Sequence, residues 1–157
     1  LLTLDLGALV ANWRALGAPA GTEAGAVVKA DAYGIGIEPA VTALSRAGCR
    51  SFFVAHLSEA VRARAVAAEA TIYVLNGLLP GQSAAFARHD LSPVLGSVAE
   101  LQEWAAFRQG SGAVRPAALH VDSGMNRLGL APDEALSLAG DGSELVDAAG
   151  VGLLMTH

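Results

Sequence analysis

The most reactive side chain in this sequence lies where an apolar run ends. Lys29 is the only lysine among ten basic residues, and it closes the apolar run that begins at Gly25. A lysine at the end of a buried strand is partly desolvated, which lowers the pKa of its amine and makes it a nucleophile and a base. The position is as compatible with Schiff-base chemistry as with a structural role. The alternative is an amine that reaches solvent and pairs with Asp31.

Three other polar side chains follow or lie between apolar runs. Tyr33 stands in the glycine-containing segment after Lys29, Arg127 in a segment rich in glycine, and His157 after the run 151–156. Taken alone, Tyr33 is a weak signal, and Arg127 and His157 are more typical of a surface charge and a packed core histidine. Their expected convergence with Lys29 on one rim favours a binding site.

The elements that would position these residues are short strands alternating with helices. Apolar residues recur at helical spacing between apolar runs that are rich in Val, Ile and Phe. This alternation predicts parallel βαβ units and therefore an α/β fold. The predicted strands are 24–30, 51–55, 71–75, 92–95, 117–122 and 151–156.

Capping residues and apolar spacing predict the helices. In the helix over 57–68, Leu57, Val61 and Ala65 are expected to face the core, with Arg62 and Arg64 turned away. Helices are predicted from Asp5, from Pro39 to Gly48, over 57–68, over 81–88, from the capping pair Ser97 and Glu100, and from Pro132.

The strand pattern favours a (β/α)8 barrel of the TIM type. The first strand is not followed by a GxGxxG turn, which argues against a dinucleotide-binding sheet. Barrel enzymes place their chemistry at the carboxyl ends of the strands, where Lys29, Tyr33, Arg127 and His157 are expected. Six predicted strands in 157 residues would form about three quarters of such a barrel, so we expect the chain to be its first part.

Composition excludes several classes of protein. The 157 residues are 53% hydrophobic and 16% charged, which is too apolar for a disordered chain. A net charge of −5 gives no basic surface for nucleic acid, and no apolar stretch reaches the roughly 20 residues that span a membrane. The lone Cys49 forms neither an internal disulfide nor a thiolate metal cluster, so we expect no metal and a cytoplasmic location. The chain starts at Leu1 rather than Met, so the removal of a leader peptide stays an open alternative.

Several segments carry a resemblance to a known family. The run VVKADAYGIG at 27–36 resembles the pyridoxal-phosphate lysine motif of the alanine racemases. The segments LDLGAL at 4–9, HVDSGMNRLG at 120–129 and LMTH at 154–157, together with Asn12, fall in that family's order and spacing. The similarity covers the whole chain and corresponds to the front part of such an enzyme.

The resemblance implies a pyridoxal 5'-phosphate site. In that case Lys29 holds the cofactor as a Schiff base and is one of two bases that exchange the Cα proton of alanine. Tyr33 would bind the cofactor phosphate, Arg127 would approach the phenolic oxygen of the ring, and His157 would pack beside the pyridine ring. The implied activity is the interconversion of L-alanine and D-alanine, which supplies D-alanine for peptidoglycan.

The resemblance also implies parts that residues 1–157 do not contain. These are the rest of the barrel, the main phosphate-binding loops and a C-terminal β-domain. The second base is expected to be a tyrosine from that domain of the partner subunit in a homodimer. We therefore expect residues 1–157, a partial barrel domain, to be inactive when expressed alone.

Two positions depart from the family pattern. Ile35 stands between two glycines where the family usually has histidine, and His120 stands where many members have a lysine that is often carbamylated. A carbamate cannot form on histidine, so His120 is interpreted as a packed strand residue or a local hydrogen-bond partner of Asp122 or Arg127.

Other functions stay open beside racemisation of alanine. A decarboxylase, an aldolase or a racemase of broader specificity can use the same cofactor and barrel, and a pyridoxal-phosphate-binding barrel protein need not be an enzyme. A plain α/β interaction domain is a further alternative, in which the single lysine is chance.

Overall fold

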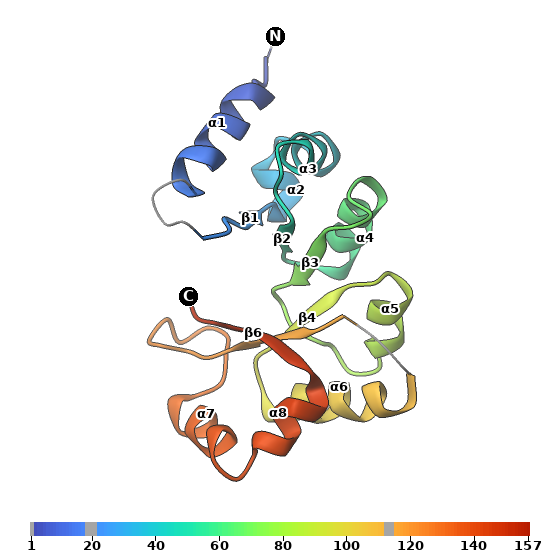
Figure 1. The fold of residues 1–157 in the computed structure, drawn as a ribbon, viewed down its shortest axis with the longest axis vertical. Coiled ribbons are helices and arrows are strands. Elements are labelled where there is room, and N and C mark those ends of the chain that lie inside the picture. Colours follow the sequence, from blue (N-terminus) through green and yellow to red (C-terminus); the bar gives the residue numbers. More distant parts are fainter. Residues whose placement is uncertain (1, 18–21, 112–114) are drawn as a thin grey trace. The chain divides into compact units, whose positions relative to one another are not determined.

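The computed structural model describes residues 2–17, 22–111 and 115–157, which Figure 1 draws as a coloured ribbon. The chain divides into two compact units, Leu1–Val74 and Leu75–His157. Each unit contains three strands that run parallel to their neighbours within that unit. Strands and helices alternate along the chain, as the sequence predicts.

The first unit is built on the parallel strands β1 (Ala26–Val27), β2 (Ser51–Val54) and β3 (Thr71–Val74). In the register, Val27 lies opposite Phe53, and Ser51 lies opposite Thr71. The predictions for β2 and β3 are confirmed to within one residue. The first strand was predicted over 24–30 but pairs only over two residues, because the backbone turns sharply after Val28.

The helices of the first unit are α1 (Leu6–Gly17), α2 (Lys29–Tyr33), α3 (Ile37–Arg46) and α4 (Leu57–Val66). Asp5 caps α1 as predicted, because its Oδ1 accepts a hydrogen bond from the amide of Ala8 at 3.0 Å. Helix α1 packs against α3. Helix α3 begins two residues before Pro39, and Val41 and Leu44 face the core as the spacing predicts.

The predicted inner face of α4 is wrong. Ala60 and Ala63 are fully buried, whereas Ala65 is exposed, because small side chains allow this helix to pack close to its neighbours. Arg62 is exposed as predicted. Arg64 is not turned away, since its Nη1 donates hydrogen bonds to three carbonyls just beyond the helix, those of Ala67, Ala68 and Ala70.

The second unit is built on the parallel strands β4 (Ser92–Leu95), β5 (Ala117–His120) and β6 (Val151–Met155). Leu95 lies opposite Leu119, and His120 lies opposite Met155. Every residue of β4 and β5 is buried, which matches their continuous apolar sequences. These strands confirm the predicted runs to within two residues.

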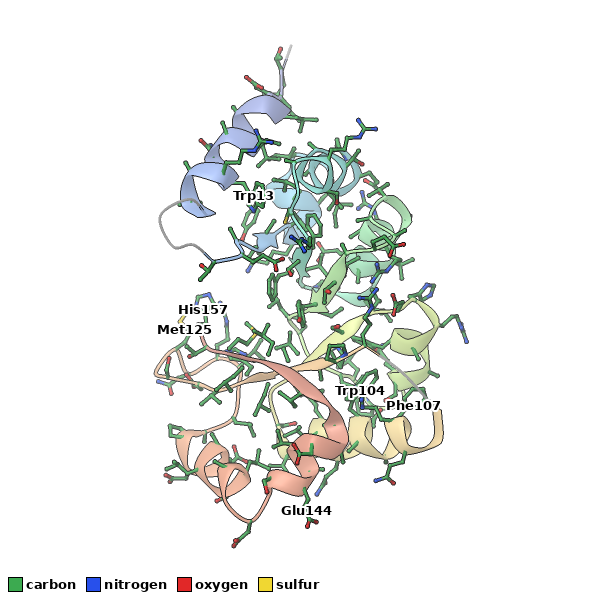
Figure 2. All side chains as sticks on the ribbon, in the orientation of Figure 1. Trp13, Trp104, Phe107, Met125, Glu144 and His157 are labelled. Atoms are coloured by element: carbon green, nitrogen blue, oxygen red, sulfur yellow. The ribbon has the colours of Figure 1, made fainter. Side chains whose placement is uncertain are left out.

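The helices of the second unit are α5 (Ser83–Arg88), α6 (Val98–Ser111), α7 (Pro132–Ala139) and α8 (Ser143–Ala149). Among the described residues Trp104 is the largest fully buried side chain, and Figure 2 shows it beside Phe107. Its ring centre lies 5.8 Å from that of Phe107 and 6.2 Å from that of Phe86. Helix α8, which packs against α6, was not predicted, because it is short and follows a glycine-containing turn. Within the described ranges, no helix is long and apolar enough to cross a membrane.

Candidate functional site

Lys29 stands at the start of an unusual turn rather than at the end of a strand. The amide of Val28 still donates to the carbonyl of Phe53 at 2.8 Å, but the strand pairing has ended at Val27. From Ala30 to Tyr33 the backbone has positive φ angles of 52° to 55°, which is a left-handed helical turn. The segment after Lys29, which the sequence analysis left without regular structure, is therefore the ordered turn α2.

This left-handed turn is strained but well bonded internally. An L-residue other than glycine costs roughly 1–2 kcal/mol in this conformation. Four such residues follow one another here, and Gly34 continues them with a φ of 85°. The amides of Ala32 and Gly34 donate to the carbonyls of Val28 and Ala30 at 3.0 and 3.1 Å. Because Tyr33 comes four residues after Lys29, the turn places it about one helical turn further along.

The amine of Lys29 has no hydrogen bond or ion pair among the described residues, and the side chain is half-buried. The alternative in which Lys29 pairs with Asp31 does not hold in this structure. The Oδ1 of Asp31 accepts instead from Nη2 of Arg62 at 2.8 Å and from the amide of Ile37 at 3.0 Å. Lys29 therefore presents a primary amine to its surroundings. The Tyr33 side chain is 64% exposed.

Arg62 links two acidic residues beside the turn. Its Nε donates to Oε1 of Glu38 at 2.6 Å, in addition to the bond with Asp31. The hydrogen bond from Arg62 is the main reason why the pKa of the Glu38 carboxyl lies below its ordinary value. The carboxylate of Asp31 thus joins α2, α3 and α4 through two partners.

Glu59 of α4 contacts the turn after Lys29, and the sequence analysis did not single it out. Its Oε2 accepts from the amides of Ala55 and His56 at 2.9 and 3.2 Å, and its Oε1 accepts from the amide of Asp31 at 3.3 Å. Burial raises the pKa of this carboxyl, but the amides of His56, Ala55, Asp31 and Ala30 together bring it below the ordinary value. Only the spacing from His56 to Glu59 was visible in the sequence, and it predicts no more than a helix cap.

In the second unit, Arg127 lies in a loop that follows β5 and is organised by Asp122. The Oδ1 of Asp122 accepts from the amides of Gly124 and Asn126 at 2.9 and 3.1 Å. These amides hold the pKa of the Asp122 carboxyl below its ordinary value. The loop closes where the amide of Leu130 donates to the carbonyl of His120 at 2.8 Å. Arg127 itself is exposed, and its guanidinium has no partner among the described residues.

A pocket of about 270 Å³ opens at the carboxyl ends of β4 and β5. The polar side chains that line it are Asn76, Ser97, Glu100, His120 and Arg127. Burial lowers the pKa of the His120 imidazole, and the nearby charges of His157 and Arg127 lower it further against the opposing effect of Asp122. His120 is only 8% exposed and has no side-chain hydrogen bond among the described residues, which supports its interpretation as a packed strand residue.

A second helix-capping glutamate of the chain, Glu100, lines this pocket. Its Oε2 accepts from the amide of Gly96 at 2.6 Å, and the amide of Glu100 donates to the Ser97 hydroxyl as the capping spacing predicts. Burial raises the pKa of Glu100, and the amides of Gly96, Leu78 and Ser97 offset this only in part. Two capping glutamates of the chain, Glu59 and Glu100, therefore have pKa shifts of opposite sign.

His157 follows β6 in the same unit as Arg127. The hydroxyls of Ser123 and Thr156 are hydrogen-bonded at 2.5 Å, which ties the Arg127 loop to the end of β6. Figure 2 labels Met125 on this loop and His157 beyond β6. The imidazole and guanidinium groups of this region can donate hydrogen bonds to a partly negative oxygen.

Each unit thus holds two of the four residues that the sequence singled out. Lys29 and Tyr33 belong to the first unit, on one turn, and Arg127 and His157 belong to the second, on adjacent segments. The first unit offers a free amine and a phenol. The second offers cationic and imidazole donors beside a pocket.

Comparison with known proteins identifies the relatives of this chain. Residues 4–157 match the family described as "Alanine racemase, N-terminal domain". An alanine racemase of Methylobacterium sp. (strain 4-46) is 62% identical over 99% of this chain and 43% of its own length. An alanine racemase of Methylobacterium nodulans is 59% identical over 99% of this chain and 42% of its own length. The chain therefore spans about two fifths of the curated relatives that it matches.

A solved structure confirms the predicted fold class. The alanine racemase from Bartonella henselae, crystallised with covalently bound pyridoxal phosphate, is 36% identical and superimposes with a TM-score of 0.89. The match covers 98% of this chain and 45% of the solved chain. The α/β fold is thus that of the first part of the alanine racemase barrel.

Proposed function

The chain belongs to the alanine racemase family, and from this premise we propose that the protein interconverts L-alanine and D-alanine with pyridoxal 5'-phosphate. The observation that supports it most directly is the position of Lys29. The chain's only lysine begins the turn after β1, and its amine has no partner among the described residues. D-alanine made in this way would serve peptidoglycan synthesis.

The residues present fit the cofactor. Pyridoxal phosphate attaches to proteins through a primary amine, and Lys29 supplies one that Asp31 does not engage. When the cofactor is bound, Tyr33 would donate to its phosphate, Arg127 would offer a cation to its phenolic oxygen, and His157 would pack beside its pyridine ring. Both hydroxyl and guanidinium are available, because neither has a partner among the described residues.

In the proposed mechanism, Lys29 has two tasks. When bound, the cofactor withdraws electrons from the substrate and makes the Cα proton acidic. The amine of Lys29 holds the cofactor in place until substrate arrives and then removes or returns that proton on one face of Cα. The ordered left-handed turn that follows Lys29 would limit the positions that its amine can take. A second base must act on the opposite face.

The proposal extends to the parts of the protein beyond these residues. We propose that residues 1–157 form part of the cofactor-binding barrel domain, since they cover only 40 to 45% of matched racemases such as those of Agrobacterium fabrum and Bartonella henselae. The remaining barrel strands, a C-terminal β-domain and a homodimer partner with the second base would complete the site. The lone Cys49 is consistent with a cytoplasmic location.

Reduction of the intact protein tests the role of Lys29. Borohydride treatment after loading with pyridoxal phosphate, followed by peptide mapping, should find the pyridoxyl group on Lys29. Lys29→Ala and Lys29→Arg should each lose racemisation in both directions by roughly a thousandfold or more, because one amine serves both attachment and proton transfer. The control Arg46→Ala removes an exposed positive charge from α3 and should retain activity.

Two results would contradict this proposal. The first is a pyridoxyl group found on another residue or on none. The second is trapping at Lys29 without racemisation of alanine, which would favour a different reaction on the same cofactor.

A further inference from the structure

The turn that carries Lys29 needs support from outside itself. Four consecutive residues, Ala30 to Tyr33, hold left-handed backbone angles without the freedom that glycine has. Such strain persists only where the surrounding structure fixes the segment. The internal hydrogen bonds of the turn are those of any single helical turn, and one turn of helix is unstable by itself.

The neighbouring strand brings a helix start to this turn. Val27 lies opposite Phe53 in the parallel register, so the residues that follow β1 and those that follow β2 leave the sheet side by side. The first of these segments is the left-handed turn. The second contains Ala55 and His56, at which α4 begins.

Glu59 joins these two segments with one carboxylate. One oxygen accepts from Ala55 and His56 at the start of α4, at 2.9 and 3.2 Å, and the other accepts from Asp31 in the turn at 3.3 Å. The side chain is half-buried, which strengthens hydrogen bonds to a charged acceptor. A helix cap alone would use only the bonds at the start of α4.

A second glutamate of the chain shows what a cap alone looks like. Glu134 stands at the same position of α7, and its Oε2 accepts from the amide of Ala131 at 3.0 Å. It makes no hydrogen bond to another segment among the described residues. The additional bond of Glu59 to the turn is therefore not a consequence of capping.

We propose that Glu59 is a positioning residue, which holds the left-handed turn against α4 and so places the amine of Lys29 for the cofactor. The role rests on the proposed function, since it concerns how the cofactor is held. Glu59 acts through the backbone of Asp31 and its neighbours. Arg62 supports the same turn from the side through the carboxylate of Asp31, at 2.8 Å.

Hydrogen exchange in the intact, cofactor-free protein tests the first half of this proposal. The amides to follow are those bonded within the turn region: Ala32, Gly34, Ile35 and Gly36. In Glu59→Ala they should exchange about tenfold faster or more, because a hydrogen bond to a charged acceptor is lost. In the matched control Glu134→Ala, which loses only a helix cap, they should exchange as in the unaltered protein.

Release of pyridoxal phosphate from the loaded protein tests the second half. The rate should rise about tenfold in Glu59→Ala and remain unchanged in Glu134→Ala, although both lose a helix-capping glutamate. Glu59→Gln retains a carbonyl oxygen that can accept part of these bonds, so it should restore slow release in part. It also serves if Glu59→Ala does not fold.

The outcomes separate this role from the proposed function. Unchanged exchange in the turn of both Glu59 variants, or equal release rates in Glu59→Ala and Glu134→Ala, would overturn the positioning role while leaving racemisation intact. A protein that binds no pyridoxal phosphate would contradict the proposed function, and the exchange measurement would still decide whether Glu59 holds the turn.

Discussion

Two segments of this molecule follow parallel strands and carry residues of the candidate site, yet they are built in opposite ways. The turn after β1 contains four consecutive non-glycine residues in the left-handed region, and Glu59 and Arg62 fasten it from α4. In the loop after β5, the residues with positive φ are Gly124, Asn126 and Gly129. The carboxylate of Asp122, at the start of this loop, accepts hydrogen bonds from two of its amides. The turn is held by bonds from other elements, whereas the loop is organised mainly by its own Asp122, with one further bond between Ser123 and Thr156.

The difference shows where each segment is vulnerable. In the loop, glycine and asparagine tolerate positive φ, so the cost is small as long as those residue types are kept. In the turn, the strain is present in the native sequence, so the supporting bonds matter more than the identity of any one strained residue. We therefore expect opposite effects on the free energy of unfolding: replacing glycine by alanine should lower it in the loop, and replacing alanine by glycine should raise it in the turn.

The largest effect is expected from Gly129→Ala in the loop. A Cβ there would lie 2.8 Å from the amide nitrogen of Asp122, on a backbone with a φ of 107°. We expect a loss of about 3 kcal/mol in the free energy of unfolding, since strain and overpacking add. Gly124→Ala is the matched control, because the Cβ that alanine adds there has no neighbouring atom within 4 Å. Backbone strain alone should lower its free energy of unfolding by about 1–2 kcal/mol. Denaturant unfolding of the intact protein measures both, and equal losses would refute the steric argument.

A smaller effect of opposite sign is expected from Ala30→Gly in the turn. Ala30 is exposed and has a φ of 52°, so glycine relieves strain there without leaving a cavity. We expect a gain of about 0.5–1 kcal/mol, because the relief exceeds the added freedom of the unfolded chain. Ala106→Gly, at an exposed position inside the right-handed helix α6, should instead lose about 1 kcal/mol. A loss at both positions would mean that the turn is not strained.

The smallest expected effect is the pH dependence of the stability that Glu59 contributes through its hydrogen bonds. The pKa of Glu59 is lowered from its ordinary value of 4.5, so its contribution to stability is present above pH 4.5 and is lost as the pH falls through the lowered pKa. The difference in unfolding free energy between the unaltered protein and Glu59→Gln should therefore shrink in acid. For Glu100, whose pKa is raised, the corresponding difference should shrink as the pH rises. Urea unfolding at several pH values checks both signs, and parallel curves for the two glutamates would contradict the assignment.

The sequence predicted the regular elements of this fold well. Apolar runs that alternate with helically spaced segments predict all six strands. The runs of β4 and β5 are continuous because a strand buried on both faces needs a continuous apolar sequence. The sequence-based predictions failed where packing against a neighbouring element determines which side chains are buried, or where a helix is short. The inner face of α4 was assigned to larger side chains, but close packing selects Ala60 and Ala63. Helix α8, whose seven residues follow Gly142, lacked the length that makes periodicity visible.

The residues of the candidate site stay predictions. Lys29 was singled out because a single lysine at the end of an apolar run is unusual, and Arg127 because of the glycines around it. The left-handed turn could not be found, because its residues show no local preference for positive φ and only Gly34 and Gly36 hint at it. The role of Glu59 was hidden for the same reason, since its bond to Asp31 joins residues 28 positions apart.

The anchoring of Asp31 also limits how the chain can change during evolution. Its carboxylate accepts from the amide of Ile37, the first residue of α3, while its carbonyl accepts from the amide of Gly36. Both bonds depend on the number of residues between Asp31 and the amides that donate to it. An insertion or deletion of one residue in this interval would move the amides of Gly36 and Ile37 away from their acceptors. The stretch from Val28 to Ile37 should therefore vary among homologues by substitution, and insertions and deletions should be confined to segments outside it.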